Sequence, residues 1–148
     1  METPDHPLQL FNTSGLELPF KESEAAFLLD VIREHQSCNY SFVEVVFVDE
    51  KEIVRINKEF LGRDYVTDII SFRYDEDTTN MEIEGTLYCC TSRIQEQAKE
   101  YCDSEKQEFL RIIVHGLIHL IGYDDQTPEE KAEMTRLENH YLKMHLDS

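Results

Sequence analysis

Apolar residues recur along the chain at two spacings, and the changes between them divide it into strands and helices. Residues 8–11 alternate enough to predict a short first strand. Residues 42–48 are β-branched and aromatic almost without interruption, which is typical of a central strand covered on both faces. Segments 66–74 and 85–90 predict two more strands, and the acidic stretch 75–80 between them is interpreted as an exposed connection.

Helical spacing of apolar residues predicts five helices. They run from Lys21 to Gln36, from the Asp49 cap to Gly62, from Ser92 to Tyr101, from Ser104 to Gly122, and from Thr127 onward. Capping patterns mark several of the starts, notably Ser92 with Gln95 and Ser104 with Gln107. The stripes expected to face the core in three of these helices are Ile53, Ile56 and Phe60; Ile94, Ala98 and Tyr101; and Met134, Leu137, Tyr141 and Met144.

Strands and helices alternate early in the chain, and helices dominate its end. We therefore expect an α+β fold, a four-stranded mixed sheet with about five helices. The 148 residues suffice for one core of ordinary size, so residues 1–148 are interpreted as a single domain. The helix from Ser104 to Gly122 is apolar nearly all round, which predicts that it is the buried central helix. Its two histidines need an explanation.

Composition narrows the classes of function. The formal charge of −17 opposes any protein that holds nucleic acid by general electrostatics, so an RNA substrate would need a local basic patch. The excess of acid also favours solubility and concentrates cations near the surface. No run of eighteen apolar residues is present and the first residues are acidic and polar, so we expect no signal peptide and a cytoplasmic location.

The four cysteines lack metal-site or disulfide-framework spacing, and we interpret them as reduced core thiols. Cys89 and Cys90 are adjacent in a predicted strand, so their side chains should point to opposite faces.

His115 and His119 are four residues apart on the predicted central helix and project from one face, where two imidazoles can reach one ion. Gly122 is placed to end the helix and let the chain turn back, which would bring Asp125 in as a third ligand. Two nitrogens and one oxygen leave a fourth position for water, the pattern of catalytic zinc. We therefore predict a metal site at the end of the buried central helix. The alternative is a pair of buried histidines that are hydrogen-bonded within the core.

Such a site indicates hydrolysis, because the cation lowers the pKa of a bound water and polarises the group under attack. Metalloproteases with the HExxH motif place a glutamate after the first histidine, whereas Gly116 stands here. A zinc peptidase is thus an alternative that lacks its usual proton acceptor.

Two segments resemble a known family. The run His-Gly-Leu-Ile-His-Leu-Ile-Gly-Tyr-Asp-Asp, from His115 to Asp125, is similar to the HGxLHLxGYDH signature of the YbeY-type bacterial ribosomal-RNA maturation endoribonucleases. Residues 57–72 resemble that family's NxxYRGxDxPTDVLSFP segment. The resemblance implies a zinc-dependent endoribonuclease that acts in maturation of the 3′ end of small-subunit ribosomal RNA and in ribosome quality control. It implies ribosomal RNA or the small ribosomal subunit as partner, with ribosomal proteins or assembly GTPases as further partners and no membrane.

The resemblance places His115 and His119 on the family's first two metal ligands. Asp125 stands at the third, where most members have histidine. We expect one Zn²⁺ per chain; an oxygen ligand also suits harder ions such as Mn²⁺. Leu61 occupies the position of a family arginine, and Arg63 is our candidate to contact a phosphate in its place.

Asp68 lies in the second matched segment and is the candidate for proton acceptor or for partner of a metal ligand. An aspartate that caps local amides at a strand end is the alternative. The cations expected to face RNA are Arg55, Lys58, Arg63 and Arg73, unless they are scattered surface charges. A non-catalytic ribosome-assembly factor with a structural metal is the alternative function, and the acidic composition and Leu61 favour it.

Overall fold

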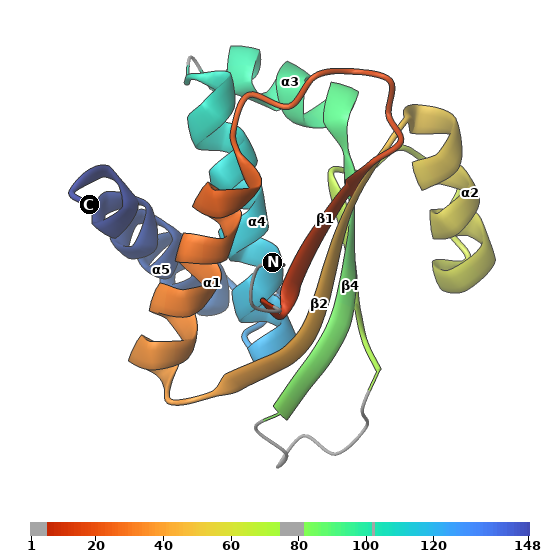
Figure 1. Ribbon diagram of the computed structural model, residues 1–148. Helices are drawn as coiled ribbons and strands as arrows, with labels where there is room; N and C mark the ends of the chain where they lie inside the picture. Colours follow the sequence, from red (N-terminus) through yellow and green to blue (C-terminus); the bar gives the residue numbers. More distant parts are fainter. Residues whose placement is uncertain (1–5, 75–81, 102) are drawn as a thin grey trace, which may run out of the picture.

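The computed structural model describes residues 6–74, 82–101 and 103–148, which form one sheet and the helices around it (Figure 1). In chain order the elements are β1 (Leu8–Asn12), α1 (Glu22–Gln36), β2 (Asn39–Val48), α2 (Glu50–Leu61), β3 (Ile69–Arg73), β4 (Glu82–Cys90), α3 (Thr91–Glu100), α4 (Glu105–Ile121) and α5 (Pro128–Leu146). The prediction of an α+β fold with a four-stranded mixed sheet and five helices is confirmed.

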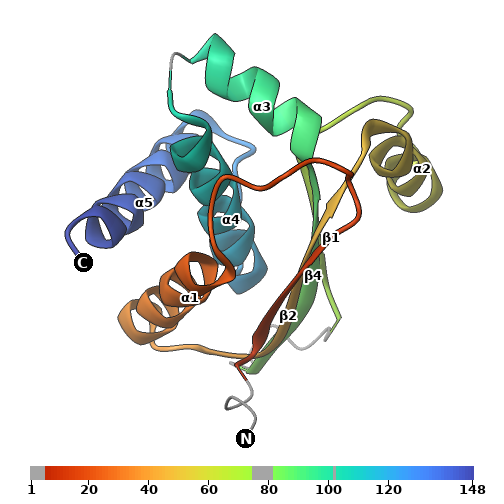
Figure 2. The same cartoon turned by 45° about the horizontal axis from the view of Figure 1, so that its top comes forward.

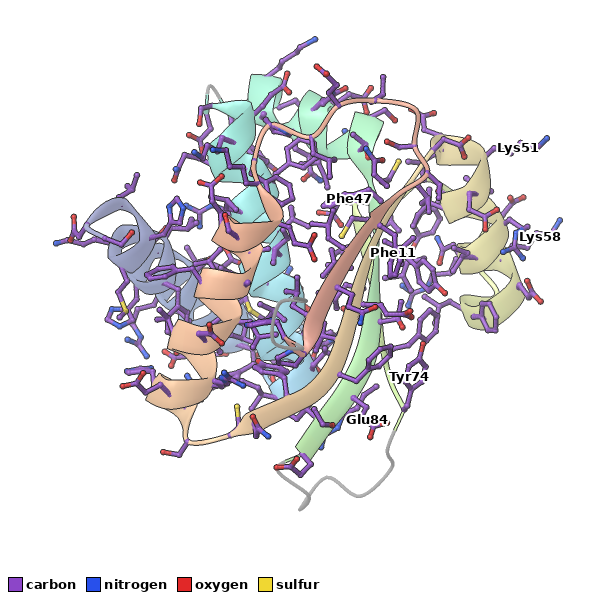
Figure 3. All side chains as sticks on the ribbon, in the orientation of Figure 1. Phe11, Phe47, Lys51, Lys58, Tyr74 and Glu84 are labelled. Carbon is purple, nitrogen blue, oxygen red and sulfur yellow. The ribbon has the colours of Figure 1, made fainter. Side chains whose placement is uncertain are left out.

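The strand order across the sheet is β1-β2-β4-β3. β1 and β4 both pair parallel with β2, while β3 pairs antiparallel with β4 and forms an edge. The prediction that residues 42–48 form a central strand is confirmed, because β2 lies between two partners and both of its faces are covered. Phe47 of β2 packs against Phe20 and Phe109 on the face that carries most of the helices, with ring centroids 5.7 Å from each (Figure 3).

Helices cover the two faces of the sheet unequally. α1, α4 and α5 lie on one side and α2 on the other, and α3 crosses one end of the sheet to join β4 to α4 (Figures 1 and 2). α4 contacts α1, α3, α5, β3 and β4, and most of its residues are buried. It is the central helix that its composition predicts.

Local capping chemistry explains where most helices begin. The side chains of Asp49, Ser104 and Thr127 each accept a hydrogen bond from the backbone amide three residues on, as predicted. The predicted cap at Ser92 is wrong. β4 runs directly into α3, so the cap position falls on Cys90, and the Ser92 hydroxyl instead donates to Glu50 at 2.8 Å.

Other departures lie at element ends. The strand predicted over 66–74 pairs only from Ile69 to Arg73, and β4 begins at Glu82, earlier than the predicted Gly85. Phe60, Tyr101 and Met144 were expected in the core but are 58%, 66% and 38% exposed. Each lies at or near the C-terminal end of its helix, and Phe60 keeps an edge-to-face contact with Phe72 of β3, with ring centroids 5.4 Å apart. The predicted connection 75–80 lies outside the described residues.

Cys89 and Cys90 are free, buried thiols that belong to the two opposite cores of the sheet, as their adjacency in a strand predicts. Cys38 is also free and partly buried. Among the described residues, no helix combines the length and apolarity that crossing a bilayer requires.

Candidate functional site

α4 carries both candidate histidines at its C-terminal half, on the side that faces β3. Ser104 caps the start of the helix and Gly122 ends it, with φ at 132°, a value that glycine adopts readily. The imidazole rings of His115 and His119 lie 6.2 Å apart between centroids. His119 is exposed and His115 is mostly buried, so one ring borders solvent and the other lies deeper.

The chain turns back after Gly122, as the sequence predicts. The turn ends at Thr127, whose capping box starts α5. It brings the Asp125 Oδ2 atom to 3.5 Å from His115 Nε2. The three residues predicted to bind a metal therefore lie together.

Each histidine ring has its other nitrogen engaged. His115 Nδ1 lies 2.8 Å from Glu138 Oε2, and His119 Nδ1 lies 2.7 Å from the carbonyl oxygen of Tyr123. Both partners are acceptors, so both rings carry a proton on Nδ1 in the neutral form and keep a lone pair on Nε2. This is how proteins prepare histidine to bind a cation.

Glu138 is a site residue that the sequence reasoning missed. It lies on α5 and is 7% exposed, although carboxylates are rarely buried without a partner. Its signal in the sequence is its position among the buried residues Met134, Leu137 and Tyr141. A glutamate on the buried face of a helix indicates a specific partner across the interface.

The histidines and Asp125 open onto a cavity of about 340 Å³ between α4, the start of β3 and the segment after α2. Its lining residues are Leu61, Arg63, Thr67, Asp68, Ile69, Ile70, Ser71, His115, His119, Asp125 and Gln126. All the residues that the sequence reasoning singled out for metal binding or catalysis border this one cavity. The structure brings together two segments that are about fifty residues apart in the sequence.

Asp68 lies directly before the first residue of β3, where the strand pairing begins. Its backbone carbonyl accepts a hydrogen bond from the Cys90 amide at 2.9 Å. Its Oδ2 accepts from the Gln97 side chain of α3 at 3.1 Å, and Oδ1 lies 3.5 Å from the Thr67 hydroxyl. The carboxylate bonds side chains rather than local backbone amides, so the alternative of a simple strand-end cap does not describe it.

The four predicted RNA-facing cations do not form one patch. Arg55 pairs with Glu52 and Glu59 on its own helix, and Arg73 donates to the Leu120 carbonyl at the end of α4. Lys58 projects from α2 on the side away from the sheet (Figure 3). Of the four, Arg63 borders the cavity, and no other described residue holds its guanidinium.

The electrostatics of the cavity are set by its carboxylates. Burial alone would lower the pKa of His115. The hydrogen bond and negative charge of Glu138 outweigh this effect, with further contributions from Asp125 and Asp68, and the pKa of the imidazole lies above its usual value. The negative surroundings that favour a proton there also favour a metal cation, and the two compete for the ring.

The donor set suits a cation, with two imidazole Nε2 atoms and one carboxylate. Within residues 6–74, 82–101 and 103–148, however, no three histidine, cysteine, aspartate or glutamate side chains already stand in the arrangement of a finished metal site. His115, His119 and Asp125 are the residues that would hold a cation here.

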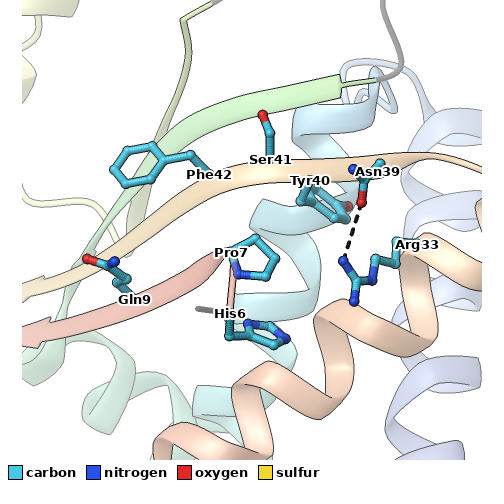
Figure 4. Close-up of a pocket in the computed structure, with 8 residues that line it drawn as sticks. All are labelled: His6, Pro7, Gln9, Arg33, Asn39, Tyr40, Ser41 and Phe42. Atoms are coloured by element: carbon cyan, nitrogen blue, oxygen red, sulfur yellow. Dashed lines mark hydrogen bonds between the residues drawn. The ribbon is translucent and has the colours of Figure 1, made fainter. Parts of the chain in front are cut away.

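A second cavity, of about 440 Å³, lies between the starts of β1 and β2 and the end of α1 (Figure 4). Arg33 in its wall already pairs with Asp30 at 2.9 Å and bonds Asn39 at 3.3 Å. None of the predicted site residues borders this cavity.

Comparison with known proteins decides the family. The profile described as "Endoribonuclease YbeY" matches residues 15–145, nearly the whole chain. The chain belongs to the YbeY endoribonuclease family. The family inferred from the two motifs is confirmed, and with it the prediction that the chain belongs among enzymes.

Similar YbeY endoribonucleases match over nearly the full length. The protein from Chlorobaculum tepidum is 37% identical over 136 residues, 92% of this chain and 96% of its own. That from Chlorobium limicola is 37% identical over 142 residues, 96% of this chain and 95% of its own. The solution structure of TM1509 from Thermotoga maritima superimposes with a TM-score of 0.60 at 25% identity, covering 93% of this chain and 88% of that one.

Proposed function

We propose that this YbeY family member is a metal-dependent endoribonuclease that cleaves ribosomal RNA, in maturation of the 3′ end of the small-subunit RNA and in ribosome quality control. The observation that carries the proposal is the single cavity that His115, His119, Asp125, Asp68 and Arg63 share. We propose the cytoplasm as its location. The small ribosomal subunit is the proposed partner, with ribosomal proteins or assembly GTPases beside it.

The residues that would hold the cation are His115, His119 and Asp125, with Zn²⁺ preferred by the two imidazoles and Mn²⁺ admitted by the carboxylate. When bound, a divalent ion of this kind supplies an activated water and polarises a phosphodiester. We propose that Arg63, which borders the cavity, contacts a phosphate of the substrate. Asp68 is the proposed proton acceptor, supported by the hydrogen bond that Gln97 donates to its carboxylate.

The first experiment measures metal content and RNA cleavage together. Purified protein should contain about one zinc or manganese per chain, and chelation should abolish cleavage of a small-subunit RNA fragment. His119→Ala should lose metal and activity. His140→Ala is the matched control, because His140 is an exposed histidine of α5 that does not border the cavity. A metal-free protein that cleaves RNA as fast as the untreated protein would refute the proposal.

A non-catalytic assembly factor with a structural metal is the second candidate. The observation that favours it is Leu61, which borders the cavity where the family pattern has arginine and is 46% exposed. Leu61→Arg should raise RNA cleavage if the nuclease proposal is right. A metal-free variant that stays folded and still restores ribosome maturation in cells lacking the protein would favour the assembly factor instead.

The peptidase alternative has a steric difficulty. A Cβ atom at Gly116 would lie 2.7 Å from side-chain atoms of Ile69 and Leu87, so this position faces the sheet. A glutamate there would clash with these two side chains unless they moved. Cleavage of a peptide library without cleavage of RNA would nevertheless reverse the order of the candidates.

A further inference from the structure

Glu138 of α5 contacts two residues of α4, one of which is a histidine of the candidate site. Its Oε2 lies 2.8 Å from His115 Nδ1, and its Oε1 lies 3.1 Å from the Arg111 guanidinium. Arg111 also donates to Asn139 Oδ1 at 2.9 Å. Both oxygens of a carboxylate that is 7% exposed are thus occupied, one by a histidine of α4 and the other by an arginine one helical turn earlier.

This arrangement differs from the surface ion pairs of the chain. Glu133 and Arg136 pair within one turn of α5, with side chains 43% and 63% exposed, and such pairs contribute little. Glu138 instead reaches from α5 to α4, where burial makes an unpaired charge costly. The interaction with Arg111 compensates for this burial and prevents the carboxylate from rotating away from His115.

A carboxylate only accepts hydrogen bonds, so its contact with His115 fixes which ring nitrogen carries the proton. Glu138 at 2.8 Å from Nδ1 is nearer than Asp125, whose Oδ2 lies 3.5 Å from Nε2, so the neutral ring is expected to carry its proton on Nδ1. His119 obtains the same result from the Tyr123 carbonyl, which no side-chain substitution removes. His115 is therefore the histidine at which tautomer control depends on a replaceable side chain.

We propose that Glu138, held in place by Arg111, is a positioning residue that sets the tautomer and orientation of His115 and so determines how tightly the site binds a divalent cation. The part that concerns the cation rests on the proposed function; the part that concerns the tautomer does not.

The first test reads the tautomer directly in metal-free protein. Nitrogen chemical shifts of ¹⁵N-labelled protein, recorded at a pH where imidazole is neutral, distinguish a proton on Nδ1 from one on Nε2. Wild-type His115 should carry the proton on Nδ1, and Glu138→Leu should shift it toward Nε2. The His119 tautomer should stay unchanged in every variant and serves as internal reference. A proton on Nε2 of His115 in the wild type would overturn the proposal.

Two further variants separate positioning from folding. Glu138→Gln keeps the size of the side chain and one acceptor, so His115 should retain its tautomer while the link to Arg111 weakens. Glu133→Gln removes an exposed glutamate from the same helix and should change nothing. If Glu138→Leu unfolds, Arg111→Met tests the same chain of contacts, from Arg111 through Glu138 to His115, by removing its first member. A more mobile His115 ring is the expected result. A ring as ordered in Arg111→Met as in the wild type would count against this chain of contacts.

The second test measures Zn²⁺ affinity by competition with a chromophoric chelator. Loss of a partner of this kind costs about 10- to 100-fold in affinity, which is the loss expected for Glu138→Leu, with a smaller loss for Glu138→Gln and none for Glu133→Gln. If the wild type binds zinc and Glu138→Leu binds it equally well, the positioning role is wrong while the proposed function stands. If the wild type binds no metal, the proposed function fails, and the tautomer measurement still decides what Glu138 does.

Discussion

Gly85 of β4 lies in close contact with both β3 and α4, and replacing it with alanine tests how the site is supported. A Cβ atom there would lie 2.5 Å from the Phe72 backbone carbonyl oxygen of β3 and 2.9 Å from a methyl group of Leu120. Leu120 follows His119 on α4. The added methyl group therefore pushes apart the edge strand and the helix end that together border the cavity.

The magnitude follows from which neighbour must move. Inserting a methyl group into a packed interior costs about 1–3 kcal/mol, and the upper part of that range applies when the neighbour is backbone. We expect Gly85→Ala to lower the free energy of unfolding by about 3 kcal/mol. For a chain of this length that corresponds to a fall in melting temperature of roughly 6–12 °C.

Gly116→Ala is the matched comparison, because the atoms nearest to its Cβ are the side-chain ends of Ile69 and Leu87, at 2.7 Å, rather than backbone. Side-chain ends can rotate, and alanine is better than glycine in a helix by about 1 kcal/mol. The net loss for Gly116→Ala should be about 0–1 kcal/mol. Urea denaturation of both variants measures the difference. Equal losses, or a larger loss for Gly116→Ala, would refute the reasoning from backbone contact.

Three further predictions concern stability. Tyr40→Phe removes a buried hydroxyl that donates to a carbonyl of α4 at 2.8 Å, and should cost about 1 kcal/mol in chemical denaturation. Thr127→Ala removes the cap of α5 and should cost about 1 kcal/mol by the same measurement. Glu24 should make stability depend on pH. Burial alone would raise the pKa of Glu24, but hydrogen bonds from Lys106 and His145, among others, hold it below its usual value. Its contribution is therefore present above the unfolded-state pKa of about 4.3 and is lost as pH falls through the lower folded-state value. Glu24→Gln should flatten that part of the profile.

Each of these predictions has a result that contradicts it. Tyr40→Phe would be as stable as the wild type if the helix carbonyl did not need the hydroxyl. Thr127→Ala should leave the first turn of α5 protected from amide exchange if the cap contributes nothing. For Glu24, an acid profile identical to that of Glu24→Gln would show that its partners do not favour the charged form.

The helices and the site motif were predictable because their signals are local. His115 and His119 are one turn apart. Within the next dozen residues, Gly122 and the Thr127 cap indicate that the helix ends and that the chain turns back into another helix. Such features depend on backbone conformation, which neighbouring residues largely determine. Arg55 was instead expected to face RNA, although the spacing of Glu52 and Glu59, three and four residues away, already indicates ion pairs on its own helix.

Glu138 was missed because its role depends on packing between two helices. It stands 23 residues beyond His115, on a helix whose angle to α4 no local pattern specifies. Glu138 stands four residues after Met134 and three before Tyr141, on the buried stripe of α5, but the sequence does not show which residue of another helix it meets. Phe60 shows the opposite error: helical spacing predicts burial, but the side chain is 58% exposed although its ring contacts Phe72. Both errors concern how one element packs against another, which is specified by the assembled fold and not by the local sequence.

The acidity of the chain constrains how RNA could be held. With a formal charge of −17, and with Asp68 and Asp125 in the cavity wall, a phosphodiester entering it meets repulsion from both. Arg63 offers one positive charge against them, and Leu61, which also borders the cavity, offers none. Under the proposed function the divalent cation must therefore also help to bind the RNA phosphate, because it supplies most of the positive charge at the point of contact. Substrate affinity and metal occupancy should then rise and fall together, and the positioning of His115 by Glu138 would govern both.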